Sequence, residues 1–281
     1  DGGLNRQRQG TEDFEHFTVE NSRLTHNCVS TLAADDRRRL WVGTWGGGID
    51  AVMMDNPSEI YHLEVDEKYQ KLLNYIGALI YDKRNNGLRI GSNDGMFFYD
   101  FDQRKLILPF ERCLDARGCI GSLIDSRGQL WMGSQTGLRI IDLTKRNKKG
   151  YPFLCNNLMY KLDKPESKMV DKITSFCQSR DGSVWIGSNS YGIYRATTDA
   201  DGELQFKAYT TEDGLANNSV KGIAEGQHGN IWITTNNGLS VLNPEDGTFT
   251  NYDETDGIVS STFYWNSALA AGKNVYLGSD K

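Results

Sequence analysis

The stretch Leu130-Trp131-Met132-Gly133-Ser134 decides the fold, because the chain of 281 residues carries five further versions of it. The six versions are Leu40–Thr44, Leu88–Ser92, Leu130–Ser134, Val184–Ser188, Ile231–Thr235 and Val275–Ser279. Their second residues stand at positions 41, 89, 131, 185, 232 and 276, which gives steps of 48, 42, 54, 47 and 44 residues. Self-similarity at this period is typical of a β-propeller, in which each repeat forms one four-stranded blade.

Each repeat is read as four strands in a fixed order. A short apolar segment with small residues, such as Ile173-Thr174-Ser175-Phe176, is predicted to form the innermost strand. A polar turn such as Asp125-Ser126-Arg127-Gly128 leads into the tryptophan phrase as the second strand. A glycine turn opens the third strand, as at Gly137-Leu138, and a more polar fourth strand follows, as at 248–252. The predicted fold class is therefore all-β.

The two ends of the chain read as complementary halves of one blade. Residues 1–6 match the glycine turn and third strand, and residues 275–281 match a second strand. Counted in this way, the chain holds five whole blades and two halves, a ring of six. The alternative is that both ends are cuts in a longer array. With only five prolines and no proline-rich run, residues 1–281 are predicted to form a single propeller domain.

Charge and cysteine usage exclude several functional classes. A net charge of −6 disfavours nucleic acid as a partner. There is no Cys-x-x-Cys pair and the four histidines are scattered, so neither a metal site nor a cofactor is predicted. Cys113 and Cys119 are read either as a local disulfide in an oxidising compartment or as free thiols.

The composite repeat resembles the two-component regulator propeller repeat. The resemblance rests on the order of inner strand, Asp-x-x-Gly turn, Leu-Trp-Ile-Gly-Thr phrase and Gly-Leu pair. It also rests on residues 211–220, which look like the family's blade-to-blade linker, with 20–27 as a looser version. Residues 256–266, followed by Tyr276-Leu277-Gly278, look like the terminal repeat of such arrays.

The resemblance implies a sensor. This repeat builds the periplasmic region of hybrid two-component regulators in gut Bacteroidetes, ahead of an immunoglobulin-like domain, a membrane helix and a histidine kinase. We therefore expect a periplasmic, non-enzymatic piece excised from an inner-membrane-anchored sensor, with an adjacent propeller and an immunoglobulin-like domain as partners in the parent chain. Propellers of this family usually have seven blades, whereas six are counted here.

Residues that occur once are better functional candidates than residues that repeat. Trp41, Trp131, Trp185 and Trp232 are assigned to the core, and Asp213 and Asp256 to matching Asp-Gly turns. Loops from second to third strand, and from fourth strand to the next inner strand, are expected at one end of the ring, where propellers commonly bind ligands. The candidate ligand-binding residues in those loops are Arg23, Trp45, Asn93, Asp94, Tyr191, Asn236 and Trp265.

Three of these candidates are aromatic: Trp45, Tyr191 and Trp265. An exposed aromatic ring beside Asn, Gln and Arg suits a sugar, which presents an apolar C–H face and a rim of hydroxyls. The alternative for each is packing at a blade edge. An insertion at 144–172 carries eight basic residues against three acids; it is read as a contact for an anionic sugar or a partner domain, or as a solvated loop.

Three functions follow. The first is a propeller that senses an oligosaccharide, and the second is a scaffold that mediates homodimerisation or docking with no small ligand. The third, less favoured, is a carbohydrate-active enzyme, for which Asp94 and Glu111 are available acids although no carboxylate pair is visible in the sequence.

Overall fold

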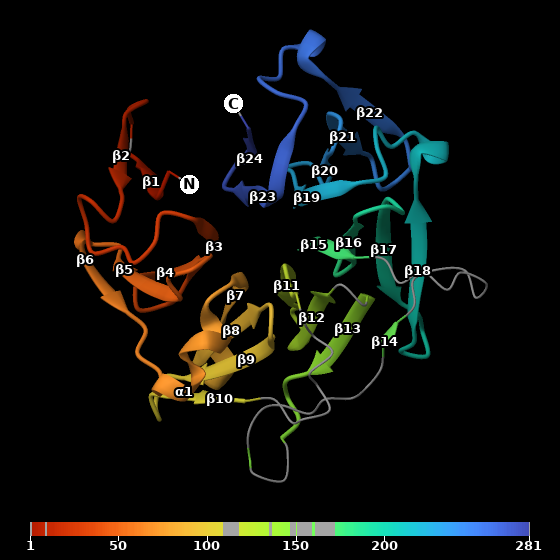
Figure 1. Cartoon of the computed structure of the whole chain (residues 1–281). Coiled ribbons are helices and arrows are strands. Elements are labelled where there is room, and N and C mark those ends of the chain that lie inside the picture. The colour runs from red at the N-terminus through yellow and green to blue at the C-terminus, as the bar shows by residue number, and fades with distance from the viewer. Residues whose placement is uncertain are drawn as a thin grey trace. The chain divides into compact units, whose positions relative to one another are not determined.

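The computed structural model describes residues 2–8, 10–108, 118–134, 137–146, 150, 159–160 and 172–280. They form antiparallel sheets joined by short loops (Figure 1). The chain divides into two compact units, residues 1–120 (the N-terminal unit) and residues 121–281 (the C-terminal unit). Within the described ranges, no helix is long and apolar enough to cross a membrane.

The N-terminal unit holds one two-stranded and two four-stranded sheets. Their strands are β1 (Leu4–Gln7) and β2 (Phe14–Phe17); β3 (Val29–Ala34), β4 (Arg39–Thr44), β5 (Ile49–Met53) and β6 (Asn56–His62); and β7 (Ile76–Asp82), β8 (Gly87–Ser92), β9 (Gly95–Asp100) and β10 (Lys105–Ile107). A short helix, α1 (Glu67–Gln70), runs into a 3₁₀ turn at Lys71–Leu73, and a second 3₁₀ turn lies at Lys83–Asn85.

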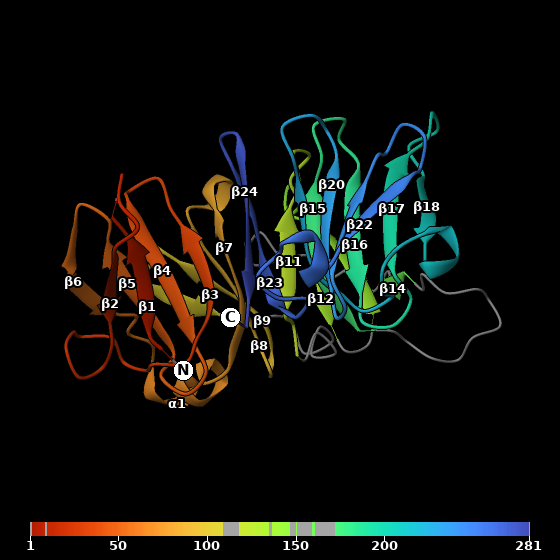
Figure 2. The ribbon, with the colours of Figure 1, turned by 90° about the horizontal axis from the view of Figure 1, so that it is seen from above.

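The C-terminal unit holds three four-stranded sheets and one two-stranded sheet. Their strands are β11 (Gly121–Ile124), β12 (Gln129–Ser134), β13 (Gly137–Asp142) and β14 (Met159–Tyr160); β15 (Ile173–Gln178), β16 (Val184–Ser188), β17 (Ile193–Thr198) and β18 (Leu204–Tyr209); β19 (Val220–Glu225), β20 (Ile231–Thr235), β21 (Leu239–Leu242) and β22 (Phe249–Tyr252); and β23 (Phe263–Ala271) and β24 (Asn274–Ser279). Figure 2 shows the strands β15 to β18 side by side in chain order.

The repeated tryptophans occupy the core, as predicted. Trp41, Trp131 and Trp185 are almost fully buried. Trp131 packs with residues of the next sheet such as Ile173 and Tyr194, and hydrophobic packing of this kind joins consecutive sheets. Trp232 departs from the pattern, because it is only partly buried.

A polar residue in the preceding turn holds each buried indole N–H. Trp41 donates to Asp35 Oδ2 (2.9 Å), Trp131 to Asp125 Oδ2 (3.0 Å) and Trp185 to Ser179 Oγ (3.1 Å). In β8, Arg89 stands in place of the tryptophan and is fully buried, and its Nη2 donates to Asp82 Oδ2 at 2.7 Å. Polar residues of the turn, Asp or Ser, therefore accept hydrogen bonds from buried donors.

Four of the inner strands have an unpaired residue near their start. In β19, Val220 pairs with Thr235 and Gly222 with Thr234, so Lys221 is left out of the ladder as a bulge. The corresponding bulge residues are Ser30 in β3, Gly77 in β7 and Thr174 in β15. Thr174 Oγ1 donates to the carbonyl of Val220 in the next sheet at 2.9 Å. Ser30 Oγ donates likewise to the carbonyl of Ile76.

The linker acids form turns, as predicted. Asp213 accepts a hydrogen bond from the backbone N–H of Thr210, and Asp256 accepts one from Asp253, each in a reciprocal capping arrangement. Gly214, which ends the first turn, has φ +109°, a conformation that favours glycine. These contacts give both acids a structural role.

The two-stranded sheets at the ends of the chain are the predicted half-blades. Gly3 N donates to Asn27 O just as Gly238 N donates to Ser261 O, which identifies β1 as a third strand. At the other end, Asp280 N donates to the carbonyl of Thr262, which identifies β24 as a second strand. In the structure β1–β2 and β23–β24 are separate sheets, so the number of blades in a closed ring stays a prediction.

Candidate functional site

One backbone hydrogen bond recurs at the same end, called here the loop end, of four of the sheets. The residue that follows the second strand donates its N–H to the carbonyl of the residue just before the inner strand. The pairs, donor first, are Trp45 to Cys28 (2.9 Å), Asn93 to Tyr75 (3.2 Å), Asn189 to Lys172 (3.0 Å) and Asn236 to Ser219 (2.9 Å). Within each of these sheets, the two predicted sets of loops therefore meet at the same end.

Trp45 and Tyr75 form an exposed aromatic pair in the N-terminal unit. Their backbones make an isolated antiparallel bridge, so their Cβ atoms lie on the same side of the bridge. The indole Nε1 of Trp45 donates to the carbonyl of Ile76 at 3.0 Å. Trp45 is nevertheless 51% exposed and Tyr75 52% exposed. The Trp45 indole is therefore anchored by its N–H, while much of its ring remains open to a ligand.

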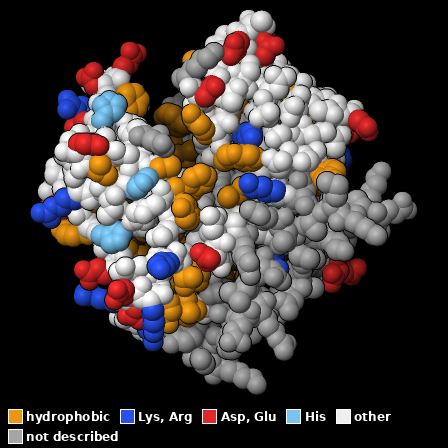
Figure 3. All heavy atoms as spheres, in the orientation of Figure 1, with side chains coloured by type: hydrophobic (Ala, Val, Ile, Leu, Met, Phe, Trp, Pro, Cys, Tyr) orange, Lys and Arg blue, Asp and Glu red, His pale blue; other side chains and the backbone are white. Residues whose placement is uncertain are grey.

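His26 lies against the glycine turn that carries Trp45. A Cβ atom added at Gly46 would lie 2.8 Å from His26 Nε2, and Gly46 has φ +126°, a conformation that favours glycine. The backbone N–H of Cys28 donates to His26 Nδ1 at 3.0 Å. In the neutral ring the proton is then on Nε2, which faces the turn as a donor. Histidine and hydrophobic side chains share the visible face of the N-terminal unit (Figure 3).

A buried carboxylate, Asp50, organises the polar side of this surface. It accepts hydrogen bonds from the backbone N–H of Thr25 (2.9 Å) and contacts His62 Nδ1 at 3.0 Å. The Asp50 side chain is fully buried, whereas that of His62 is 48% exposed. This pair was missed in the sequence, although a signal existed. Asp50 is the one acid at a position that is otherwise Phe97, Arg139, Tyr194 and Ser240 in the four-stranded sheets.

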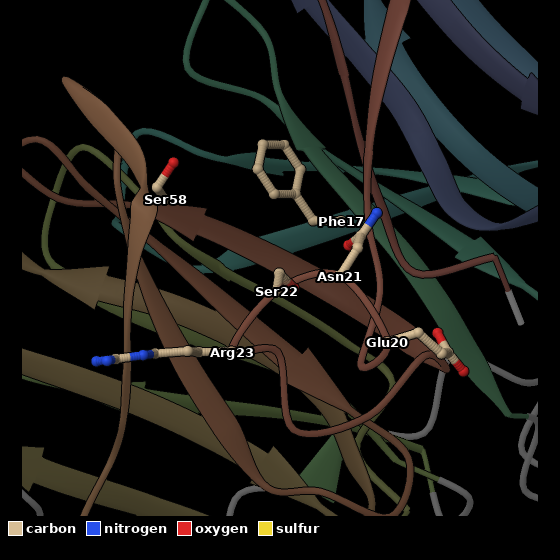
Figure 4. A pocket seen from close by; sticks show the side chains of 6 residues that line it. All are labelled: Phe17, Glu20, Asn21, Ser22, Arg23 and Ser58. Carbon is tan, nitrogen blue, oxygen red and sulfur yellow. The ribbon is translucent and has the colours of Figure 1, made fainter.

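The remaining N-terminal candidates lie at two places. Asn93 and Asp94 are exposed in the loop beside Tyr75, where Asp94 N donates to Ser92 Oγ at 3.0 Å. Arg23 lines a separate hollow with Phe17, Glu20, Asn21, Ser22 and Ser58. Figure 4 shows its side chain extending away from Phe17 and Glu20. Asn93 and Asp94 are thus close to the aromatic pair through Tyr75, whereas Arg23 belongs to the other hollow.

The C-terminal unit has its own aromatic candidate, Trp265, at the start of β23. The Nζ atom of Lys221 lies 3.5 Å from the centroid of its ring, and that of Lys172 lies 5.3 Å from it. Trp265 is 38% exposed, but Lys221 is only 8% exposed. Burial, and then the charge of Lys172, lower the pKa of the Lys221 ammonium.

Tyr191 and Asn236 are placed differently. Tyr191 is half-buried and packs against the core cluster that contains Trp131, which is the blade-edge packing alternative. Its backbone N–H donates to Ser188 Oγ at 2.8 Å. Asn236 is exposed in the loop after β20. In the C-terminal unit, Trp265 is therefore the aromatic candidate with polar surroundings.

Several expectations fall on other residues. Glu111, Cys113 and most of the basic insertion lie outside the described residues, while Cys119 is described and buried. Lys145, at the start of the insertion, pairs with Asp142 at 3.4 Å. Among the residues that the structure describes, no group of three His, Cys, Asp or Glu side chains is placed to hold a metal ion.

Comparison with known proteins identifies the repeat. The family model of the two component regulator propeller matches residues 23–46, 168–190 and 214–237. A histidine kinase of Formosa agariphila is 24% identical over 325 residues, which cover 95% of this chain and 23% of the kinase. The chain thus spans about a quarter of the length of that relative.

Solved structures show the same fold. The extracellular domain of a protein described as a hybrid two component system of B. thetaiotaomicron has a TM-score of 0.76 and 22% identity, over 99% of this chain and 35% of that one. A catalytically inactive virginiamycin B lyase of Staphylococcus aureus, solved with quinupristin, has a TM-score of 0.62 and 14% identity, over 91% of this chain and 80% of that one. These likenesses and the antiparallel sheets confirm the predicted all-β propeller of four-stranded blades.

Proposed function

We propose that this chain, which is built from two component regulator propeller repeats, is an extracytoplasmic sensor region of a hybrid two-component histidine kinase and responds to an oligosaccharide. The extracytoplasmic location is supported by the solved neighbour described as an extracellular domain. The kinase, a membrane anchor, an adjacent propeller and an immunoglobulin-like domain would belong to the parent chain. Signalling then requires only that the ligand bind one of two conformations more tightly than the other.

The observation that carries the sugar proposal is the half-exposed pair of Trp45 and Tyr75. An indole ring is large and rigid, and it offers an apolar face to the C–H side of a pyranose. His26, Asn93 and Asp94 lie around the pair and offer donors and acceptors to the hydroxyl rim. The Nε1 bond from Trp45 to Ile76 holds the ring in place before a ligand arrives, which reduces the entropy lost on binding.

The test is calorimetric titration of the chain with a panel of neutral oligosaccharides. We expect at least one of them to bind, and Trp45→Ala to weaken that binding by about tenfold or more, as for a central aromatic contact. Trp45→Phe keeps a ring but removes the Nε1 bond, so it separates the platform from the anchor. Tyr61→Ala is the matched control, because Tyr61 is equally exposed in the same unit but lies on the fourth strand β6.

Two results would contradict this assignment. One is an absence of binding to every member of the panel. The other is an equal loss of affinity in Trp45→Ala and Tyr61→Ala, since the effect would then not belong to the loop end of the sheets. A Trp45→Phe variant that binds as weakly as Trp45→Ala would shift the role of Trp45 from the ring to its hydrogen bond.

A scaffold function is favoured by a different observation. Leu269 and Tyr276 pair across β23 and β24, and both are largely exposed. Adjacent apolar side chains on an open two-stranded sheet suit a homodimer or a neighbouring domain. Light scattering during the same titrations distinguishes the two functions, because a scaffold self-associates whether or not sugar is present.

An enzymatic function has less support. Asp94 is an exposed turn residue, and Glu111, the other available acid, lies outside the described residues. The likeness to the lyase concerns the fold alone, at 14% identity. His62, which contacts the buried carboxylate of Asp50, takes no catalytic role in this proposal.

A further inference from the structure

We propose that Lys221, Lys172 and Trp265 form a subsite for an acidic sugar, with the sugar's carboxylate on the lysines and its ring beside the indole. This inference deepens the proposed function and rests on it for the sugar part of the ligand. It assigns a ligand class, sugars that contain a uronic acid residue, to the C-terminal unit.

The first argument is the position of Lys221 in the repeat. It is the bulge residue of β19, where β3 has Ser30, β7 has Gly77 and β15 has Thr174. The hydroxyl residues at this position tie one inner strand to the next through a carbonyl. Lys221 makes a different contact, because its ammonium lies over the ring of Trp265. Lys221 therefore replaces a structural contact with a cation near the loop end of the inner strands.

The second argument is the state of that cation. Lys221 is 92% buried, given its 8% exposure, and it makes no ion pair or hydrogen bond with any residue that the structure describes. Taking an ammonium partly out of water without an anion is costly, because the face of the Trp265 ring replaces only part of the lost solvation. The approach of Lys172 to the same ring adds repulsion. An anionic group placed between the two ammoniums would relieve both costs.

The third argument is that an aromatic ring lies next to the two lysine ammonium groups. The Nζ atom of Lys221 is 3.5 Å from the indole centroid, so an anion that contacts it also lies next to the indole. Trp265 keeps 38% of its surface exposed for an apolar contact. Trp265 itself lies in an enlarged bulge, since Phe263 pairs with Ser279 and the next pair is Ala268 with Leu277. A charged group joined to an apolar ring face, as in a uronate, matches this combination better than a bare inorganic anion does.

The experiment is titration of the chain with digalacturonate, its methyl ester, inorganic phosphate and inorganic sulfate. We expect digalacturonate to bind at least about tenfold more tightly than the uncharged ester, because a charge-assisted hydrogen bond is lost in the ester. Lys221→Met should remove this preference, and Trp265→Ala should weaken both sugars. The matched control is Lys207→Met, because Lys207 Nζ lies 4.6 Å from the ring of Tyr209 on β18, away from this site.

A second variant guards against misfolding. Lys221→Arg keeps the charge and should retain the preference for the acid, whereas Lys221→Met should fold at least as well as the native chain, because it removes a buried charge. Equal binding of acid and ester would overturn the subsite. So would equal losses in Lys221→Met and Lys207→Met, or competition by phosphate or sulfate at the affinity of digalacturonate, which would mean a site for any anion.

The outcome separates this inference from the proposed function. If the chain binds neutral sugars through Trp45 and shows no preference for acidic sugars, the sensor proposal holds and the acidic-sugar subsite is overturned. If the chain binds digalacturonate through Lys221 and Trp45→Ala has no effect, the subsite holds and the proposed sugar contact of Trp45 in the N-terminal unit is overturned.

Discussion

At the scale of single residues, the turn before each tryptophan strand carries more of the fold than its polar sequence suggests. Asp125 accepts hydrogen bonds from the backbone N–H groups of Arg127 and Gln129 and from the indole of Trp131. All of these bonds converge on one buried carboxylate. In the same position of another repeat, Gly226 offers no side-chain acceptor, and Trp232 is only partly buried there. Among these repeats, the indole is almost fully buried where the turn supplies a side-chain acceptor and only partly buried where it does not.

We expect Asp125→Ala to lower the free energy of unfolding by about 3 kcal/mol, because it leaves the buried N–H of Trp131 and two backbone N–H groups without acceptors. Urea denaturation followed by circular dichroism measures the change. Asp201→Ala is the control, since Asp201 is an exposed turn residue, and it should change stability by less than about 0.5 kcal/mol. Equal effects of the two substitutions would show that the carboxylate of Asp125 does not support the turn.

Candidate residues could be found from the sequence only when they broke the repeat visibly. Trp45 and Trp265 stand outside the tryptophan column, and both carry exposed rings. Tyr191 breaks the pattern too, but it packs on the core, because an aromatic residue in a loop can turn inward as easily as outward. Lys221 was not among the predicted residues, because it lies in an inner strand and the candidates were loop residues. Its signal was a single lysine in a column of Ser, Gly and Thr.

At the scale of elements, the inner strands are held to one another by their bulge residues as well as by apolar packing. Thr174 is fully buried, and its hydroxyl reaches the first residue of β19. Replacing it with valine keeps the branched shape but removes the donor. We expect Thr174→Val to lower the free energy of unfolding by about 1 kcal/mol, the usual net value of one such bond.

The measurement is again urea denaturation, with Thr250→Val as the control. Thr250 lies exposed on the fourth strand β22, where a β-branched residue is equally suited. A Thr174→Val variant as stable as this control would mean that apolar packing alone joins β15 to β19.

The order of strands within a sheet was predictable for a physical reason. A run of apolar residues that ends in small ones suits a strand buried on both faces, and Val184–Ser188 has this form and is buried throughout. Contacts between a loop and a neighbouring sheet, such as Trp45 to Ile76, depend on the three-dimensional path of the chain. No spacing in the sequence encodes them.

At the scale of the whole molecule, the unequal completeness of the sheets predicts unequal stability. Strand β20 lies between β19 and β21 and is almost wholly buried. Strand β24 pairs with β23 alone, and its residues are exposed or half-buried. Amide groups at such an edge open more readily, since only one neighbour must separate.

In hydrogen exchange followed by mass spectrometry, we therefore expect peptides from 274–279 to exchange at least about tenfold faster than peptides from 231–235. Protection of β24 equal to that of β20 would contradict this and would mean that a further strand covers its edge. The variant Leu269→Glu, on the neighbouring strand β23, then shows where the covering strand comes from. If it comes from another copy of the chain, the variant should lose both the protection of β24 and the dimers seen in light scattering. If it belongs to the same chain, the variant should keep the protection as a monomer, and the ring would be closed.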